Sequence, residues 1–298
     1  MVRIISSVPQ ALQRRWEPSG RRGRADWNHI NSVSYNARLD QIVLSVHKFS
    51  ELWVIDHSTT IDQAAGHTGG NSGKGGDILY RWGNPKAYRA GDNSDQQLFA
   101  QHDVSWIAPG LPGAGNMLTF NNGQLRANGD YSTIDEIVVP VDKKGKYTSV
   151  KGTAPGPNKP AWTYAAKKKG SFYSANLSGT QRLDNGNTLA CSGEKGRFFE
   201  VTPAGKIVWE YINPVICYEN GPPATPPGMN RSAGGAPVRG HGNSVFNIYR
   251  YGSDYPGLKG KDLAPGKPLK EIIAEQPQEQ SPGQGPDTPR SRIRSRLR

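Results

Sequence analysis

The sequence predicts an all-β protein built as a β-propeller, and three observations carry this prediction. Glycine (36 residues) and proline (23 residues) make up about a fifth of the 298 residues, whereas hydrophobic residues make up only 35%. Helical bundles and coiled coils avoid this composition, because glycine and proline destabilise helix interiors. Short stretches of alternating polarity recur along the chain, separated by turn residues. The third observation is a strand pattern with two aromatic residues, which returns three times.

This recurring strand places two aromatic side chains at positions i and i+2, and therefore on one face of a sheet. It occupies residues 78–85, 161–164 and 207–214, with the pairs Tyr80/Trp82, Trp162/Tyr164 and Trp209/Tyr211. A β-sandwich also consists of short alternating strands, but it does not predict a repeated aromatic fourth strand. The pattern therefore favours a propeller, whose blades each contain four strands.

Three further strands are predicted before each aromatic strand, which gives units of four. The first unit has strands at 32–35, 41–45 and 51–56, the second at 104–107, 115–120 and 136–141, and the third at 180–183, 185–190 and 197–201. An Asn185-Gly186 pair predicts a tight hairpin in the third unit. Residues 241–251 look like part of one more unit. Closed propellers have four to eight blades, so the chain is predicted to hold about three to four blades of a larger ring.

Most of the positive charge lies at the two ends of the chain. Residues 1–24 carry a net charge of +5 and residues 281–298 carry +4, out of +12 in total. We therefore expect a basic, non-propeller segment at 1–24, a partial propeller domain at 25–275 and a disordered tail rich in Arg, Pro and Gln at 276–298. No aromatic residue stands between the charges of this tail, so a nucleic-acid partner is not predicted.

The sequence also bears on membrane insertion, export and disulfides. No apolar run approaches the roughly 18 residues of a membrane-spanning helix, so no membrane span is predicted. The first residues lack the apolar core of a secretory signal peptide. Two cysteines, Cys191 and Cys217, allow one disulfide bond but no disulfide framework.

Histidines stand at the beginning of predicted inner strands. His29 and His102 occupy this position in two units, and His241 is a third candidate. His47 follows the second strand of the first unit. A single histidine in such a place more often caps a strand than serves a site. Several imidazoles around a propeller channel, however, suit nucleophilic catalysis, acid–base catalysis or metal binding, and the pattern alone leaves these three open.

The sequence lacks the residue spacing that phosphate binding by a P-loop and hydrolysis by a serine or cysteine nucleophile require. The glycine-rich stretch 66–77 departs from the P-loop pattern on both sides of Lys74, so phosphate binding is not predicted there. Ser178 and Cys191 have no neighbouring histidine in a nucleophile elbow, so a serine or cysteine hydrolase is not predicted either.

Four segments, taken in order, resemble the arylsulfate sulfotransferases. They are DWNHINSVSY (26–35), QIVLS (41–45), QHDVSW (101–106) and FNNG (120–123). The resemblance covers roughly residues 25–265 and is closest to the branch with the motifs WVIDHS (53–58) and YRWGNP (80–85). It implies a six-bladed propeller that moves a sulfuryl group from an aryl sulfate to a phenol. Since this family works without PAPS, no cofactor is expected.

The resemblance also implies roles for four residues. The family's nucleophile, which forms a transient sulfohistidine, falls on His102. Its His-x-Asn pair falls on His29 and Asn31, which would hold sulfuryl oxygens or protonate the leaving phenol. A channel arginine of the family is replaced by His47, which would then contact substrate in its place. No metal ligand is assigned.

The resemblance is partial, and this leaves alternatives open. The family's N-terminal blades and signal peptide have no counterpart, so the chain resembles an N-terminally truncated member. Its location is left unassigned, because the family is usually exported. Open propeller edges allow a homo-oligomer. The alternative function is a non-catalytic or decayed partial propeller that serves as a binding module.

Overall fold

The computed structural model describes residues 26–148, 152–215, 243–269 and 271–272. The chain divides into two compact units, Met1–Lys259 and Gly260–Arg298. All described strands belong to the first unit, and the described residues of the second are exposed. Four parts of the sequence predictions lie outside the described residues: the segment 1–24, the tail 276–298, His241 and Cys217.

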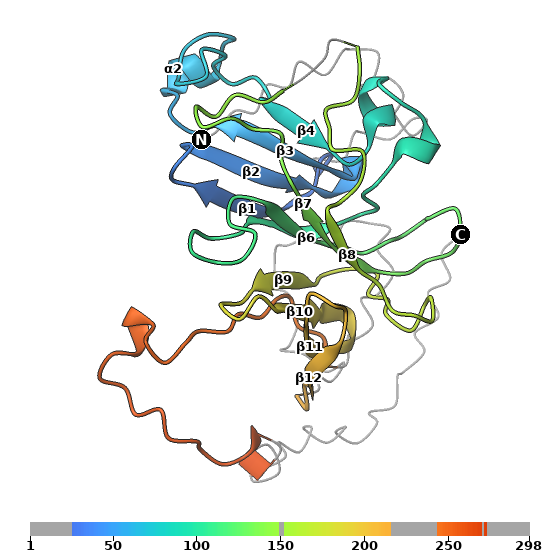
Figure 1. Cartoon of the computed structure of the whole chain (residues 1–298), viewed down its shortest axis with the longest axis vertical. Helices are drawn as coiled ribbons and strands as arrows, with labels where there is room; N and C mark the ends of the chain where they lie inside the picture. Colours follow the sequence, from blue (N-terminus) through green and yellow to red (C-terminus); the bar gives the residue numbers. More distant parts are fainter. Residues whose placement is uncertain (1–25, 149–151, 216–242, 270, 273–298) are drawn as a thin grey trace, which may run out of the picture. The chain divides into compact units, whose positions relative to one another are not determined.

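The all-β class is confirmed, because the described strands form three four-stranded antiparallel sheets, each in chain order (Figure 1). Sheet 1 contains β1 (Ile30–Asn36), β2 (Gln41–Val46), β3 (Glu51–Asp56) and β4 (Tyr80–Trp82). Sheet 2 contains β5 (His102–Trp106), β6 (Met117–Asn121), β7 (Thr133–Ile137) and β8 (Trp162–Tyr164). Sheet 3 contains β9 (Gly179–Arg182), β10 (Thr188–Ser192), β11 (Arg197–Val201) and β12 (Ile207–Ile212).

Among the described residues from 26 to 259, the helical elements are single turns. They are η1 (His47–Phe49), α2 (Ile61–Ala64), η2 (Pro85–Tyr88), η3 (Asn93–Asp95), η4 (Gly193–Lys195) and η5 (Pro256–Leu258). In this part of the chain no helix has the length and apolar character needed to cross a bilayer.

Turn chemistry explains the hairpin between β9 and β10. Gly186 has a φ of 83°, a left-handed conformation that glycine adopts without strain. The Leu183 N–H donates to the carbonyl of Asn187 at 2.9 Å, which closes the turn. The predicted Asn185-Gly186 hairpin is therefore present.

Two strand predictions need correction. The strand predicted at 136–141 lies at Thr133–Ile137, because buried hydrogen bonds allow polar Asp135 and Glu136 to stand inside it. Residues 243–251, the described portion of the segment predicted to be part of one more unit, contain no strand. This segment instead lies along sheet 3, where the Val245 N–H donates to Gly193 and the Ser178 N–H donates to the carbonyl of Phe246.

The first strands of the three sheets are neighbours: β5 packs against both β1 and β9. Between β1 and β5, the Ser32 hydroxyl donates to the carbonyl of Val104 at 3.3 Å. Between β5 and β9, the Thr180 N–H donates to the Asp103 carboxylate at 2.7 Å. Side chains at the beginning of these strands are thereby brought together.

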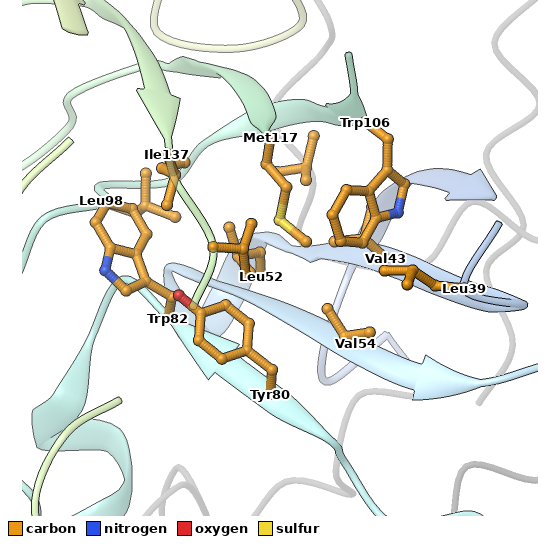
Figure 2. Close-up of a cluster of buried hydrophobic side chains, with 12 residues drawn as sticks. Leu39, Val43, Leu52, Val54, Tyr80, Trp82, Leu98, Trp106, Met117 and Ile137 are labelled. Atoms are coloured by element: carbon orange, nitrogen blue, oxygen red, sulfur yellow. The ribbon is translucent and has the colours of Figure 1, made fainter. Parts of the chain in front are cut away.

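Two apolar clusters hold neighbouring sheets to one another. Between sheets 1 and 2, Trp106 and Met117 pack against Val43, Leu52 and Val54 (Figure 2). Between sheets 2 and 3, the core is largely aromatic and consists of Phe120, Tyr164, Phe172 and Phe199 with apolar neighbours. Burial of these side chains is the main stabilising contribution to the packing of the sheets.

Candidate functional site

Three histidines predicted from the sequence lie in one row. The ring centroids of His29 and His47 are 5.0 Å apart, and those of His47 and His102 are 5.1 Å apart. His29 precedes β1, His47 begins η1 after β2, and His102 begins β5. The row therefore crosses from sheet 1 to sheet 2 at the ends where β1 and β5 begin.

His102 is the buried member of this row, with 5% of its surface exposed. Its Nδ1 lies 2.8 Å from Oδ1 of Asn122. Burial lowers the pKa of His102, while the hydrogen bonds to Asn122 and to the Ala100 carbonyl act in the opposite direction. The imidazole is therefore neutral near pH 7, as a nitrogen nucleophile must be.

The backbone around His102 departs from regular strand geometry. Ala100 and Asp103, which flank it, both have a φ of 55°, in the left-handed region. A bulge interrupts the pairing of β5 with β6 between His102 and Ser105. Bulges commonly occur next to active sites, where they redirect a side chain out of the regular pleat.

His47 is also neutral near pH 7, because burial and two neighbouring histidines lower its pKa. Burial, followed by the neighbouring His102 and His29, lowers the pKa of His47 to about 4. Its Nδ1 is buried and has no hydrogen-bond partner among the described residues. His47 therefore does not carry the positive charge that an arginine would supply at this position.

The adjacent Lys48 provides a positive charge close to the row. Its ammonium group donates to the Asp26 carboxylate at 3.0 Å. Asp26 also lies 2.7 Å from Nδ1 of His29. The hydrogen bonds to His29 and then to Lys48 lower the pKa of Asp26 to about 2. The ionised Asp26 thus orients His29, whose own backbone is left-handed with a φ of 49°.

Asn31 offers a hydrogen-bond acceptor to the site. Its amide nitrogen donates to the carbonyl of Gln101 at 2.9 Å. Its Oδ1 is buried and, within the described part of the chain, has no donor partner. Asn31 is therefore tied to the residue before His102, and its amide oxygen is a buried acceptor.

The two other histidines among the described residues, His57 and His67, lie elsewhere. His57 follows β3 at the opposite end of sheet 1, where its Nδ1 lies 2.7 Å from Asp40. His67 lies 2.6 Å from Asp77 in the glycine-rich loop. The backbone N–H groups of Ser72, Gly75 and Gly76 in this loop donate to acceptors within the chain. Cys191 is buried with a free thiol.

Comparison with known proteins identifies the family of the chain. A model of the family described as Arylsulfotransferase (ASST) matches residues 8–215, which is more than half of the sequence. The chain belongs to the arylsulfotransferase family. The match begins inside the basic segment 1–24 and includes all twelve described strands. A search of curated proteins gave no match.

Solved structures similar to this chain are distant from it. A protein of unknown function from Bacteroides caccae is 14% identical, with a TM-score of 0.33 over 61% of this chain and 45% of its own. A streptogramin B lyase is 14% identical, with a TM-score of 0.30 over 64% of this chain and 57% of its own. Virginiamycin B lyase from Staphylococcus aureus is 11% identical, with a TM-score of 0.29 over the same shares. The chain spans about half the length of these structures.

Several residues of the site were not assigned from the arylsulfotransferase motifs. Asp26, Gln101 and Asn122 stand inside the quoted segments, beside residues that were assigned. Asp103 accepts from β9, and burial raises the pKa of its carboxyl to about 6. In the described residues, no group of three or more His, Cys, Asp or Glu side chains is placed to hold a metal ion.

The lowered pKa of His47 makes the stability of the chain depend on pH. In the unfolded chain His47 titrates near 6.5, whereas in the folded chain its pKa is about 4. Below 6.5 the unfolded state binds a proton that the folded state does not, so stability falls as the pH drops towards 4. We expect the native sequence to lose more free energy of unfolding than His47→Gln between about pH 7 and about pH 4.5. Urea unfolding at both pH values measures this difference.

The lowered pKa of His102 also reduces stability at low pH. His102 is present in both the native sequence and His47→Gln, as are Asp26, Lys48 and the other titrating groups. Their contributions therefore cancel in the comparison. Equal losses of stability in the native sequence and in His47→Gln would show that His47 is protonated as readily when folded as when unfolded.

Proposed function

We propose that this chain transfers a sulfuryl group from an aryl sulfate to a phenol through a sulfohistidine on His102, without PAPS. The observation that carries the proposal is the state of His102. This imidazole is buried and neutral, and its Nδ1 lies 2.8 Å from the amide oxygen of Asn122. Nε2 is left to attack sulfur. Membership of the arylsulfotransferase family supports sulfuryl transfer as the reaction class.

The neighbours of His102 suit the two half-reactions. In the first, Nε2 of His102 attacks sulfur and the phenol leaves, taking a proton from His29, which Asp26 orients at 2.7 Å. In the second, the acceptor phenol loses its proton to His29 and its oxygen bonds to sulfur, while the S–N bond breaks and its electron pair returns to Nε2 of His102. His47 lies between the two other imidazoles and lines the site as a neutral ring.

The same proposal extends to the architecture. We propose that the three sheets are consecutive blades of a six-bladed propeller and that β1, β5 and β9 line its channel. The contacts of β5 with both β1 and β9 support this arrangement. The aryl sulfate would then enter along the channel, where the three imidazoles lie.

The test is a transfer assay with the whole chain, an aryl sulfate that releases a coloured phenol, and a second phenol as acceptor, with no PAPS present. We expect phenol release that depends on the protein, and parallel lines in double-reciprocal plots against donor and acceptor, as a ping-pong reaction requires. Protein-dependent release with intersecting lines would contradict the covalent route. Complete absence of transfer would contradict the enzymatic proposal itself.

A further inference from the structure

Asn122 is fully buried between His102 and a loop that precedes sheet 3. Its amide nitrogen donates to two backbone carbonyls, those of Ser174 at 2.9 Å and Leu177 at 3.1 Å. Its amide oxygen faces Nδ1 of His102 at 2.8 Å. Two carbonyls accept hydrogen bonds and never donate them, so the amide has only one orientation that satisfies all three contacts.

We infer that Asn122 fixes the tautomer of His102, with the proton on Nδ1 and the lone pair on Nε2. An amide oxygen is an acceptor, so the atom facing it must be an N–H. In a neutral imidazole the other nitrogen then carries the lone pair. Asn122 is thus a positioning residue, which acts on sulfur only through His102. The catalytic consequence rests on the proposed function, whereas the tautomer does not.

The loop that holds Asn122 is built to present carbonyl groups. Leu177 and Ser178 have φ values of 57° and 90°, in the left-handed region where non-glycine residues are strained. The Ser178 hydroxyl donates to that of Ser174 at 2.9 Å and accepts from the Gly193 N–H at 3.0 Å. These bonds tie the loop to sheet 3. The strain is consistent with a backbone held in place for the sake of the amide that it binds.

A second set of contacts fixes the backbone of Asn122. The Ser132 hydroxyl donates to the Asn122 carbonyl at 2.9 Å and accepts from the Ser174 N–H at 3.0 Å. Side chain and backbone of Asn122 are therefore both held by residues of this one network. Rotation of the amide would place its oxygen against the carbonyls of Ser174 and Leu177, with no donor for either.

The sulfuryl-transfer step uses this tautomer. The lone pair of Nε2 forms the N–S bond while the S–O bond to the aryl group breaks, and the electron pair of that bond goes to the phenolate. The phenolate takes up a proton from His29. The sulfated ring becomes an imidazolium that keeps its proton on Nδ1. The bond to Asn122 strengthens as the ring gains positive charge, so it stabilises the transition state more than the ground state.

The inference can be tested without any activity, by NMR of the whole chain labelled with ¹⁵N-histidine. The sequence has six histidines, and a His102→Gln sample identifies the signals of this one by their loss. At neutral pH we expect Nδ1 of His102 to show the shift of a protonated, pyrrole-like nitrogen and Nε2 that of an unprotonated, pyridine-like nitrogen. A protonated Nε2 with an unprotonated Nδ1 would overturn the inference.

A matched pair of variants separates positioning from general stability. Asn122→Ala removes the contact with Nδ1, and we expect a mixture of the two tautomers and a loss of kcat/KM of about 10- to 100-fold, as for other hydrogen bonds that orient a functional histidine. Gln124→Ala removes an amide that donates to Ala175 in the same loop but does not touch His102. We expect it to leave both the tautomer and kcat/KM near their native values.

The outcomes distinguish this inference from the proposed function. A native protein with the Nδ1–H tautomer and no sulfuryl transfer would support the inference and contradict the function. A native protein that transfers sulfuryl groups although His102 has the Nε2–H tautomer would support the function and contradict the inference. If Asn122→Ala fails to fold, the tautomer of the native protein still decides the inference. A variant that folds and keeps the native tautomer would show that Asn122 does not set it.

Discussion

Replacing His102 by glutamine is expected to abolish sulfuryl transfer. The change removes the only nitrogen in the proposed mechanism that forms a bond to sulfur, so the covalent route is lost rather than slowed. Loss of a covalent nucleophile lowers kcat by on the order of 10⁴-fold or more in enzymes of this kind. The measurement is phenol release from an aryl sulfate at saturating donor, together with peptide mass mapping of protein quenched in the absence of acceptor. In the native chain we expect the sulfuryl group on the peptide that contains His102.

A matched control is His57→Gln, which changes a histidine at the opposite end of sheet 1. This imidazole contacts Asp40 and the ring of Tyr35, and is remote along the strands from the row of three histidines. We expect it to retain native activity. If His102→Gln released phenol within about tenfold of the native rate, the nucleophile would have to be another residue. A sulfuryl group found on His29 or His47 would identify which one.

Strands were predicted correctly where a stretch of alternating polar and apolar residues is bounded by turn residues. The predicted strands at 51–56 and 197–201 match β3 and β11 residue for residue. β7 was misplaced because its middle residues, Asp135 and Glu136, are buried in spite of their charge. Asp135 accepts from Asn121 and Thr163 at 2.9 Å each, and these partners come from the strands on either side. Pairing of this kind is decided by tertiary contacts, which the local pattern does not contain.

For the candidate site, too, some features could be predicted from the sequence, whereas others depend on tertiary contacts. Repeat positions and motif resemblance were enough to select His29, Asn31, His47 and His102, and the structure brings all four to the neighbouring ends of sheets 1 and 2. Their roles stay predictions. The partner of His102 was not predictable, although Asn122 stands within a quoted motif. Its orientation depends on carbonyls more than 50 residues further along the chain, in a loop with no periodic signal.

Replacing Phe172 by alanine is expected to cause the largest loss of stability. Only 2% of this side chain is exposed, and its ring lies 5.3 Å from that of Phe199 and 5.5 Å from those of Phe120 and Tyr164. Removing a buried aromatic ring costs about 3–5 kcal/mol, because burial is lost and a cavity is left. Domains are stable by only about 5–15 kcal/mol, so this is a large fraction of the total. Urea unfolding followed by tryptophan fluorescence measures it.

The control is Phe246→Ala, which removes the same ring at a position that is 60% exposed and should change stability by less than about 0.5 kcal/mol. A loss below about 1 kcal/mol for Phe172→Ala would mean that the aromatic cluster does not hold sheets 2 and 3 together. The position also couples packing to the site. The Phe172 carbonyl accepts from the Ser132 N–H at 2.9 Å, and the loop that binds Asn122 follows directly. We therefore expect Phe172→Ala, unlike Phe246→Ala, to broaden or shift the ring ¹⁵N signals of His102 under conditions where the variant is still folded.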